Sequence, residues 1–552
     1  MLEHIVAAFL TSANVKTLLF MSIGAVAGLI AGAIPGFTIA MAVVLTLPFT
    51  FGMPAEQGLT TMIGVFVGGL SGGLMSGILI GIPGTPSSIA TVFDGFPMAR
   101  KGRPGYALGL GVWSSFAGGL ISAVVLIVLA PQLARIGLEF QPWDYFSLVL
   151  FALTITVSLA GDDMTKGMIA GVMGLFLATV GEYDLNGVDR FTFGSDFLQS
   201  GFGFPPVLIG LFAFSQLMSD IRDRLGARKV LMDMGGGKVN IRIEHRKAAT
   251  TVLKHWTNVV RSSLIGIFVG ILPAAGSSIS NILSYDQAKK ASKNPELFGT
   301  GVEDGIIASE TANNATAGGA LITMMALGIP GDIITAVMLG ALLIHDITPS
   351  PKFIVEQPVL AYSLFIAFFI SNFIVLALQS MTLRLFVQIT KVAMYVLAAV
   401  ILVYCGIGVF ALSNATSDMW TLLLFGLLGY VMRELSFPLA PMILGVILGP
   451  IAERWLARAT TLSSDPTLFV THHWSLFFLV LTVFSLLFPL YQRDAGKRPW
   501  ARYYTPALFV GLAVPLALMG GYVRPGLSAV LLIAAVVFFI RPSAGALPEL
   551  RE

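Results

Sequence analysis

The chain alternates long apolar stretches with short polar loops from one end to the other. Residues 107–133, 363–378, 392–412 and 474–490 are such apolar runs. They approach or reach the ~20 residues that a helix needs to cross a bilayer. Because these runs recur from end to end of the chain, the pattern predicts an all-α, polytopic transmembrane protein without a large soluble domain.

Short glycine and proline motifs interrupt the apolar pattern at matching places. Residues 32–35 read Gly-Ala-Ile-Pro and residues 270–273 read Gly-Ile-Leu-Pro, while residues 81–84 and 328–331 both read Gly-Ile-Pro-Gly. Each break frees backbone amides and carbonyls, which are costly in hydrocarbon unless they are satisfied. Broken or re-entrant helices in two matching segments are typical of a transport site.

The charges of the loops indicate how these two segments are oriented. Residues 220–261 hold ten Lys and Arg against four acids and should be cytoplasmic, together with residues 100–103. Residues 182–203 hold four acids and a single Arg, and residues 344–352, which are nearly free of basic charge, should also lie outside. Each segment then crosses an odd number of times in opposite directions, which predicts two inverted-topology repeats.

This organisation divides the chain into five parts. We expect a first motif region, the remaining first-half spans with a basic cytoplasmic linker, a second motif region, the remaining second-half spans, and an extra C-terminal pair of spans. Their ranges are 1–104, 105–261, 262–356, 357–492 and 493–552.

Composition agrees with a membrane protein and excludes several other classes. Hydrophobic residues make up 56% and charged residues 11% of the chain, against about 25% charged residues in soluble domains. The net charge of +3 is spread over short loops, so no nucleic-acid partner is expected. The single cysteine, Cys405, excludes an internal disulfide. No ATP site or other cofactor site is visible, so an ion gradient, Na⁺ or H⁺, would drive any transport.

The motifs bring together groups that suit a carboxylate. A proline that ends one helix lets another begin, and the free amides of a helix start attract an anion. Nearby hydroxyls would add donors. The candidate substrate-binding residues are Pro35, Gly36, Thr38, Gly81, Pro83, Gly84, Thr85, Ser87, Ser88, Gly276, Ser277, Ser278, Gly328, Pro330 and Gly331.

A second group of polar residues suits a cation. Asn313 and Asn314 are adjacent amides in an apolar segment, and amide oxygens are hard ligands of the kind that Na⁺ uses. Glu310 could neutralise the ion or carry a proton, and Thr316 adds a hydroxyl. The alternative is that small and polar residues only let helices pack closely. We favour packing for the Gly24, Gly28 and Gly32 series and for Gly68 and Gly72, and a cation site for the two asparagines.

Two other functions remain open from the residues alone. Ser71 lies in a Gly-x-Ser-x-Gly pattern typical of hydrolases, but the pattern falls in an apolar helix with no preceding strand. His345 is the histidine near a motif, and a helix-end role is the simpler interpretation. A membrane-embedded enzyme and a passive anion channel are therefore the alternatives to a transporter.

The sequence resembles the large membrane subunit, TctA, of the tripartite tricarboxylate transporters. Residues 81–103 and 310–351, with their Gly-Ile-Pro-Gly, Ala-Asn-Asn-Ala and Ala-Leu-Leu-Ile-His runs, carry the resemblance, which extends from about residue 15 to about residue 491. Gly81, where many members have Asn, and residues 70–73 depart from the family pattern, and the spans after Arg502 exceed its usual length.

The resemblance implies secondary transport of a tricarboxylate such as citrate, or of a related carboxylate, by Na⁺ or H⁺ symport. It also implies a multi-pass protein of the bacterial inner membrane. The expected partners are a small TctB-like membrane subunit, a periplasmic TctC-like binding protein that delivers the substrate, and the surrounding lipid. The departures at Gly81 and residues 70–73 put citrate itself in doubt.

Overall fold

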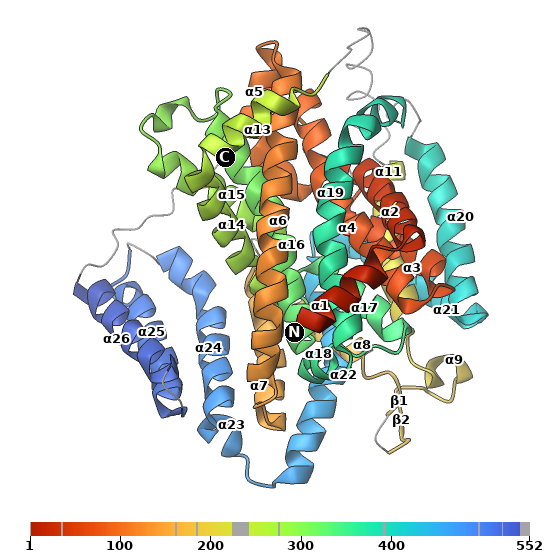
Figure 1. The fold of residues 1–552 in the computed structure, drawn as a ribbon. Coiled ribbons are helices and arrows are strands. Elements are labelled where there is room, and N and C mark those ends of the chain that lie inside the picture. The colour runs from red at the N-terminus through yellow and green to blue at the C-terminus, as the bar shows by residue number, and fades with distance from the viewer. Residues whose placement is uncertain are drawn as a thin grey trace. The chain divides into compact units, whose positions relative to one another are not determined.

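The structure is a computed structural model of a helical protein (Figure 1). It describes residues 2–34, 37–159, 163–183, 186–222, 242–273, 276–389, 394–494, 497–520 and 523–540. Apart from a two-stranded antiparallel ribbon, the regular elements in these ranges are helices. The all-α prediction is confirmed.

The chain divides into two compact units. The first consists of Met1–Leu138 and Phe202–Ser436, and the second of Glu139–Gly201 and Phe437–Glu552. All the residues predicted to bind substrate or cation belong to the first unit, so the fold is described mainly there.

The first unit begins with the segment that holds the first pair of motifs. Its elements are α1 (Leu2–Ser12), α2 (Val15–Ala33), α3 (Ile39–Phe51), α4 (Ala55–Ile80), the short 3₁₀ helix η1 (Pro86–Ser88), α5 (Ile89–Arg100) and α6 (Pro104–Gly137). After residue 202 come α10 (Phe204–Leu208), the π-helical η2 (Ile209–Phe214) and α11 (Ser215–Arg222).

The second pair of motifs lies in the helices that follow. These are α13 (His245–Lys254), α14 (Trp256–Ile271), α15 (Gly276–Ala291), η3 (Pro295–Leu297), α16 (Glu303–Leu327), α17 (Ile333–Ile344) and α18 (Pro351–Glu356). The unit ends with α19 (Pro358–Ile389), α20 (Met394–Ser413) and α21 (Thr416–Glu434).

The second unit is built from the helices and the strand pair of residues 139–201 and from the C-terminal helices. Its elements are α7 (Pro142–Leu159), α8 (Met164–Leu177), the strands β1 (Gly181–Glu182) and β2 (Asp189–Arg190), α9 (Asp196–Gln199), α22 (Leu439–Leu462), α23 (Leu468–Thr471), α24 (His473–Asp494), α25 (Ala501–Leu518) and α26 (Val523–Ile540). The two stretches predicted to close the chain are therefore helices, α25 and α26.

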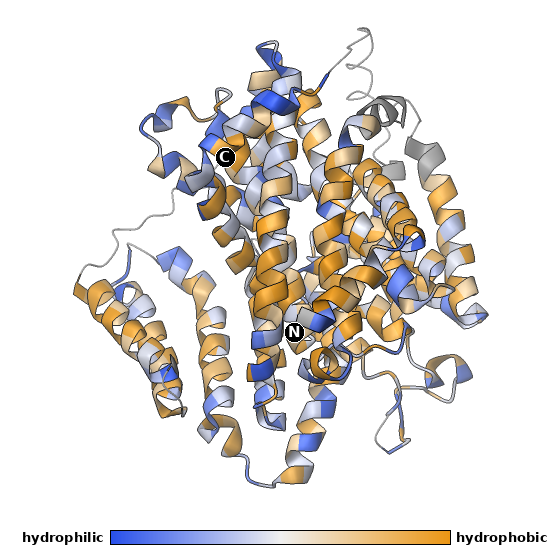
Figure 2. Ribbon diagram, in the orientation of Figure 1, coloured by the Kyte–Doolittle hydropathy of each residue, from blue (hydrophilic) through white to orange (hydrophobic). Residues whose placement is uncertain are grey.

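Within the described ranges, seven helices are long and apolar enough to cross a membrane. They are α2, α4, α6, α19 in its Pro358–Met381 part, α22, α24 and α25. Figure 2 shows hydrophobic residues along the sides of the helices and hydrophilic residues concentrated at their ends and in loops. Large apolar side chains stay exposed on helix flanks, for example Leu264 and Phe268 of α14 at 59% and 65% exposure. Apolar side chains on a helix flank can face lipid tails, because the tails are apolar as well.

The core of the first unit is formed by α4 and α16, which are buried along almost their whole length. α2 packs along α4, α14 packs along α16, and α6 packs against α16 from another side. Small residues let neighbouring backbones approach these buried helices closely: α4 is rich in Gly, and α16 is rich in Ala and Gly.

Candidate functional site

Both Gly-Ile-Pro-Gly motifs end a buried helix in the same way. The C-cap of α4 is Gly81 (φ +76°) and the C-cap of α16 is Gly328 (φ +73°). Both lie in the left-handed region, which glycine adopts without the steric cost that a Cβ imposes. The prolines two residues later, Pro83 and Pro330, have no amide to continue a helix. The predicted helix breaks are confirmed at these two motifs.

The helix that follows each break begins with a capping box. At the first, the Thr85 amide donates to the Ser88 hydroxyl (3.4 Å), which donates in turn to the Thr85 carbonyl (2.9 Å). At the second, the Thr335 amide donates to the Asp332 carboxylate (2.7 Å) and the Asp332 amide donates to the Thr335 hydroxyl (2.9 Å). A carboxylate of the chain itself therefore already occupies the start of α17, whereas hydroxyls line the start of η1.

The two segments also share their closest backbone contacts. A Cβ on Gly84 would collide with the Gly32 carbonyl oxygen, and one on Gly331 would collide with the Gly270 carbonyl oxygen. A Cβ on Gly32 would in turn meet the carbonyl oxygen of Gly69, and one on Gly270 that of Thr316. α2 to α5 and α14 to α17 thus repeat one set of contacts.

The spaced glycines of α2 and α4 serve packing. A Cβ on Gly24 would collide with the Thr61 carbonyl oxygen, and one on Gly28 with that of Val65. Gly68 and Gly72 face Ala25 and Leu29 of α2 in the same way. The preference for packing at these glycines is confirmed.

The start of α15 lies near both motifs. Gly276 (φ +65°) faces Asp332 of the second motif (residues 328–335). The Asn281 side-chain amide, further along α15, donates to the Ser87 carbonyl of the first motif (residues 81–88). Ser277 is buried and Ser278 half-buried. The structure therefore brings together Ser87, Gly276 and the second motif, which are far apart in the sequence.

The first motif offers hydroxyls around this point. The hydroxyls of Thr85 and Ser87 form a hydrogen bond of 2.9 Å. Both residues are buried, as is Ser88. Thr38 instead caps α3, its hydroxyl accepting from the Met41 amide at 3.2 Å. Pro35 and Gly36 lie outside the described residues.

The four predicted cation residues lie on one stretch of α16 and are buried. The Asn313 amide donates to the Leu70 carbonyl (3.1 Å), and among the described residues its side-chain oxygen has no hydrogen-bond partner. Asn314 accepts from the Ser71 hydroxyl (3.0 Å) and donates to the Glu310 carbonyl (3.2 Å). Thr316 instead turns to α15, its hydroxyl 2.5 Å from that of Ser280.

The Glu310 carboxylate is fully buried and held by two hydroxyls that the sequence reasoning missed. Thr91 of α5 donates to one carboxylate oxygen (2.5 Å) and Ser115 of α6 to the other (2.8 Å). Within the part of the chain that the structure describes, no ion pair joins Glu310 to a cationic side chain. With one hydroxyl donor on each oxygen and no cationic side chain, a buried carboxylate is stabilised further by a proton or a bound cation.

Thr91, Ser115 and Asn281 carried a weak signal in the sequence. Thr91 and Ser115 are polar residues within the apolar stretches around the first motif, and Asn281 follows the serines of the second. Their partners lie 219, 195 and 194 residues away along the chain. The sequence alone could therefore not show which groups they meet.

Ser71 has the surroundings of a structural residue. It lies inside α4, its hydroxyl donates to Asn314, and its carbonyl accepts from the Gln379 amide (2.8 Å). Both of these partners are amides, and neither can act as a base that activates a nucleophile. His345 is the C-cap residue of α17, as the helix-end interpretation predicted.

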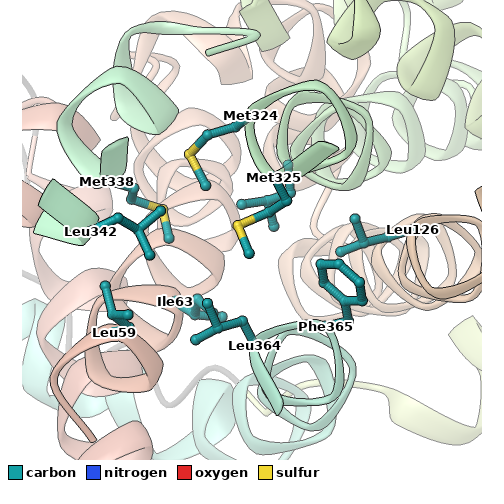
Figure 3. A pocket seen from close by; sticks show the side chains of 10 residues that line it. Leu59, Ile63, Leu126, Met324, Met325, Met338, Leu342, Leu364 and Phe365 are labelled. Atoms are coloured by element: carbon teal, nitrogen blue, oxygen red, sulfur yellow. The ribbon is translucent and has the colours of Figure 1, made fainter. Parts of the chain in front are cut away.

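A small cavity lies where α4, α6, α16, α17 and α19 meet (Figure 3). Its volume is about 10 Å³, near the lower limit for one water molecule. Every lining side chain is hydrophobic: Leu59, Ile63, Leu126, Leu321, Met324, Met325, Met338, Leu342, Leu364 and Phe365. The cavity has no group that could recognise a carboxylate.

The helices, their apolar flanks and their buried polar breaks define a multi-pass membrane protein. The model of the tripartite tricarboxylate transporter TctA family matches residues 18–444. The chain therefore belongs to the TctA family, and it is a transporter component and not an enzyme.

Two proteins of Agrobacterium vitis are similar to the chain. The 52.8 kDa protein of the TAR-I ttuC' 3' region is 30% identical over 469 residues, which cover 84% of this chain and 91% of that protein. The protein of the TAR-II ttuC' 3' region is 32% identical over 234 residues, 42% of this chain and 97% of its own length. No solved structure matches the chain.

Proposed function

We propose that the chain is the large transmembrane subunit of a binding-protein-dependent secondary transporter. It takes up a tricarboxylate or a related carboxylate with Na⁺ or H⁺ by alternating access, in the inner membrane of a bacterium. Membership of a tripartite family implies TctB and TctC partners, and we assign to them the roles of a small membrane subunit and a periplasmic binding protein.

The observation that carries this proposal is the set of matched contacts in the two segments. Gly84 on Gly32 and Gly331 on Gly270 are equivalent contacts, and the helix breaks and capping boxes next to them are equivalent too. Together with the opposite loop charges, they support two inverted repeats whose broken helices meet at one site. Packing alone does not require proline-containing breaks inside buried segments.

We place the carboxylate at the first motif and the start of α15. Thr85, Ser87 and Ser88 supply hydroxyls, and Gly276 and Ser277 begin a helix whose amides favour an anion. At the second motif the Asp332 carboxylate already accepts from Thr335. The Asp332 carboxylate therefore already takes the place that a substrate carboxylate would occupy at the start of α17.

We place the cation at the second repeat. Aligning Gly81 with Gly328 pairs Glu310 with Ile63, Asn313 with Phe66 and Asn314 with Val67. Ile63 lines the apolar cavity of Figure 3, whereas Glu310 is a buried carboxylate near the Asn313 side-chain oxygen, which has no partner among the described residues. Of the two equivalent places, the one with oxygen ligands suits a cation, and the apolar one does not.

Uptake by proteoliposomes tests the proposal. The chain would be purified with its membrane partner, reconstituted, and supplied with the binding protein and a panel of labelled dicarboxylates and tricarboxylates, with and without gradients of Na⁺ and pH. We expect accumulation of at least one carboxylate that depends on the binding protein and on one gradient. Equilibration without accumulation, independent of both, would instead identify a passive channel.

A further inference from the structure

Asp94 of α5 is a buried carboxylate that none of the proposed binding sites uses. Its Oδ1 accepts from the backbone amides of Gly299 (2.9 Å), Gly301 (2.7 Å) and Val302 (2.8 Å). Its Oδ2 accepts from the Tyr285 hydroxyl of α15 (2.8 Å). Four donors from the second repeat therefore converge on one side chain of the first.

The loop between α15 and α16 is shaped for this carboxylate. Gly299 and Gly301 have φ of +92° and +103°, a conformation that turns successive amides toward one point and that residues with a Cβ rarely adopt. A Cβ on Gly301 would lie 3.0 Å from the Met98 amide of α5. The loop thus follows the surface of α5 closely.

Further contacts hold α5 against α15 on either side of Asp94. Lys101, just after α5, donates to the Thr300 carbonyl (2.6 Å), and Asn281 of α15 donates to the Ser87 carbonyl just before α5. Tyr285 packs edge-on against Phe93 and Phe298, with ring centroids 5.3 and 5.4 Å apart. The whole of α5, including the motif that precedes it, is tied to the second repeat.

In the described ranges, the equivalent place in the other segment, between α3 and α17, shows none of these bonds. Aligning Gly81 with Gly328 pairs Asp94 with Ala341 of α17, and aligning Gly32 with Gly270 pairs Tyr285 with Leu47 of α3. Ala341 and Leu47 are both buried, and α3 packs against α17. Apolar contacts lack the directionality of hydrogen bonds, so α3 and α17 can shift past each other without leaving a buried charge unpaired.

We propose that Asp94 is a gating residue. Its bonds to Tyr285 and to the 299–302 loop form a latch that keeps α5 and the first motif closed against α15. Opening toward the cytoplasm requires this latch to break, whereas the apolar α3–α17 pair opens toward the other side without one. The gating role rests on the proposed transport function, but the latch itself can be measured without substrate.

The test measures how fast a reporter cysteine at the first motif reacts with a membrane-impermeant maleimide. Ser87, which is buried, is changed to cysteine (Ser87→Cys) in the full-length chain with its membrane partner, after Cys405→Ser removes the native thiol. Inside-out vesicles present the cytoplasmic side to the reagent. Asp94→Ala should raise the labelling rate by about tenfold or more, and Tyr285→Phe, which removes one bond but keeps the ring, by a few-fold.

A matched reporter separates a latch from general loosening. Ile334→Cys stands at the equivalent position of the second motif and should label from the cytoplasmic side at the same rate with and without Asp94→Ala. An unchanged Ser87→Cys rate, or an equal rise at both reporters, would overturn the proposal. If Asp94→Ala does not fold, an unchanged rate in Tyr285→Phe has the same consequence.

The labelling result is independent of the uptake result. Loss of the proposed function would appear as a wild-type complex that accumulates no carboxylate, even though the Ser87→Cys rate still responds to Asp94→Ala. Failure of the latch would appear as normal uptake by the wild type with labelling that ignores both variants.

Discussion

The Ser71 hydroxyl of α4 donates a 3.0 Å hydrogen bond to the side-chain oxygen of Asn314 on α16. This bond joins the two buried helices that end in the Gly-Ile-Pro-Gly motifs, and the Asn313 amide adds a second bond to the Leu70 carbonyl. This polar contact therefore links α4 and α16, the two core helices of the first unit, and the proposed cation residues are part of it.

The Asn314 side chain should matter for the cation beyond its bond to Ser71. Asn314→Ala and Ser71→Ala both remove the bond between the helices, and each should cost about 1 kcal/mol of stability. Only Asn314→Ala removes the amide oxygen, so it alone should weaken the cation dependence of uptake, by about tenfold in the half-saturating cation concentration. Uptake at graded Na⁺ and pH measures this, and equal losses in the two variants would contradict the cation assignment.

The contacts of Gly84 and Gly331 predict that neither position accepts a side chain. A methyl group at either would overlap a backbone carbonyl oxygen that cannot move away cheaply. Gly84→Ala and Gly331→Ala should each lower stability by about 1–3 kcal/mol, as overpacking does. Thermal unfolding of the detergent-purified protein measures the loss. Gly52→Ala is the control, because Gly52 has φ −78° and nothing within 4 Å of an added Cβ.

The two left-handed C-caps should differ in what they tolerate. Asn adopts positive φ more readily than other residues with a Cβ. At Gly81 the nearest atoms belong to the Phe96 ring at 3.0 Å, which can turn aside, whereas at Gly328 the Pro349 carbonyl oxygen lies 2.5 Å away. Gly81→Asn should therefore keep transport and Gly328→Asn should lose it.

Gly81→Val serves as the comparison for that pair. A β-branched residue at φ +76° should cost about 1–2 kcal/mol or more. Uptake that survives in Gly81→Val as well as in Gly81→Asn would show that the left-handed cap is dispensable.

The hydroxyls around Glu310 should stabilise its charge. Thr91→Val and Ser115→Ala each remove a donor from a fully buried carboxylate, and each should destabilise the protein by about 1.5–3 kcal/mol. In a Glu310→Gln background the same substitutions should cost about 1 kcal/mol or less, because an uncharged amide needs these donors less. Double-mutant cycles of thermal unfolding give both numbers. Equal costs in the two backgrounds would mean that the hydroxyls only fill space.

The sequence by itself determined the membrane class, the positions of several long apolar helices and the breaks at the Gly-Ile-Pro-Gly motifs. These features depend on local chemistry: apolar length for a span, positive φ at Gly81 and Gly328, and missing amides at Pro83 and Pro330. The spacing of Gly24, Gly28 and Gly32 likewise predicted close packing, because residues four apart share one face of a helix. Asn313 and Asn314 stood out as amides in an apolar setting.

The tertiary structure decided which of these groups meet. Thr91 and Ser115 reach Glu310, Asn281 reaches Ser87, and Asp94 collects the amides of the 299–302 loop, across about 200 residues of chain in each case. Sequence motifs carry no information about such distances, because the packing of α5, α6, α15 and α16 brings the partners together. Only that packing places the Ile63 side chain at an apolar cavity and the Glu310 carboxylate between the Thr91 and Ser115 hydroxyls.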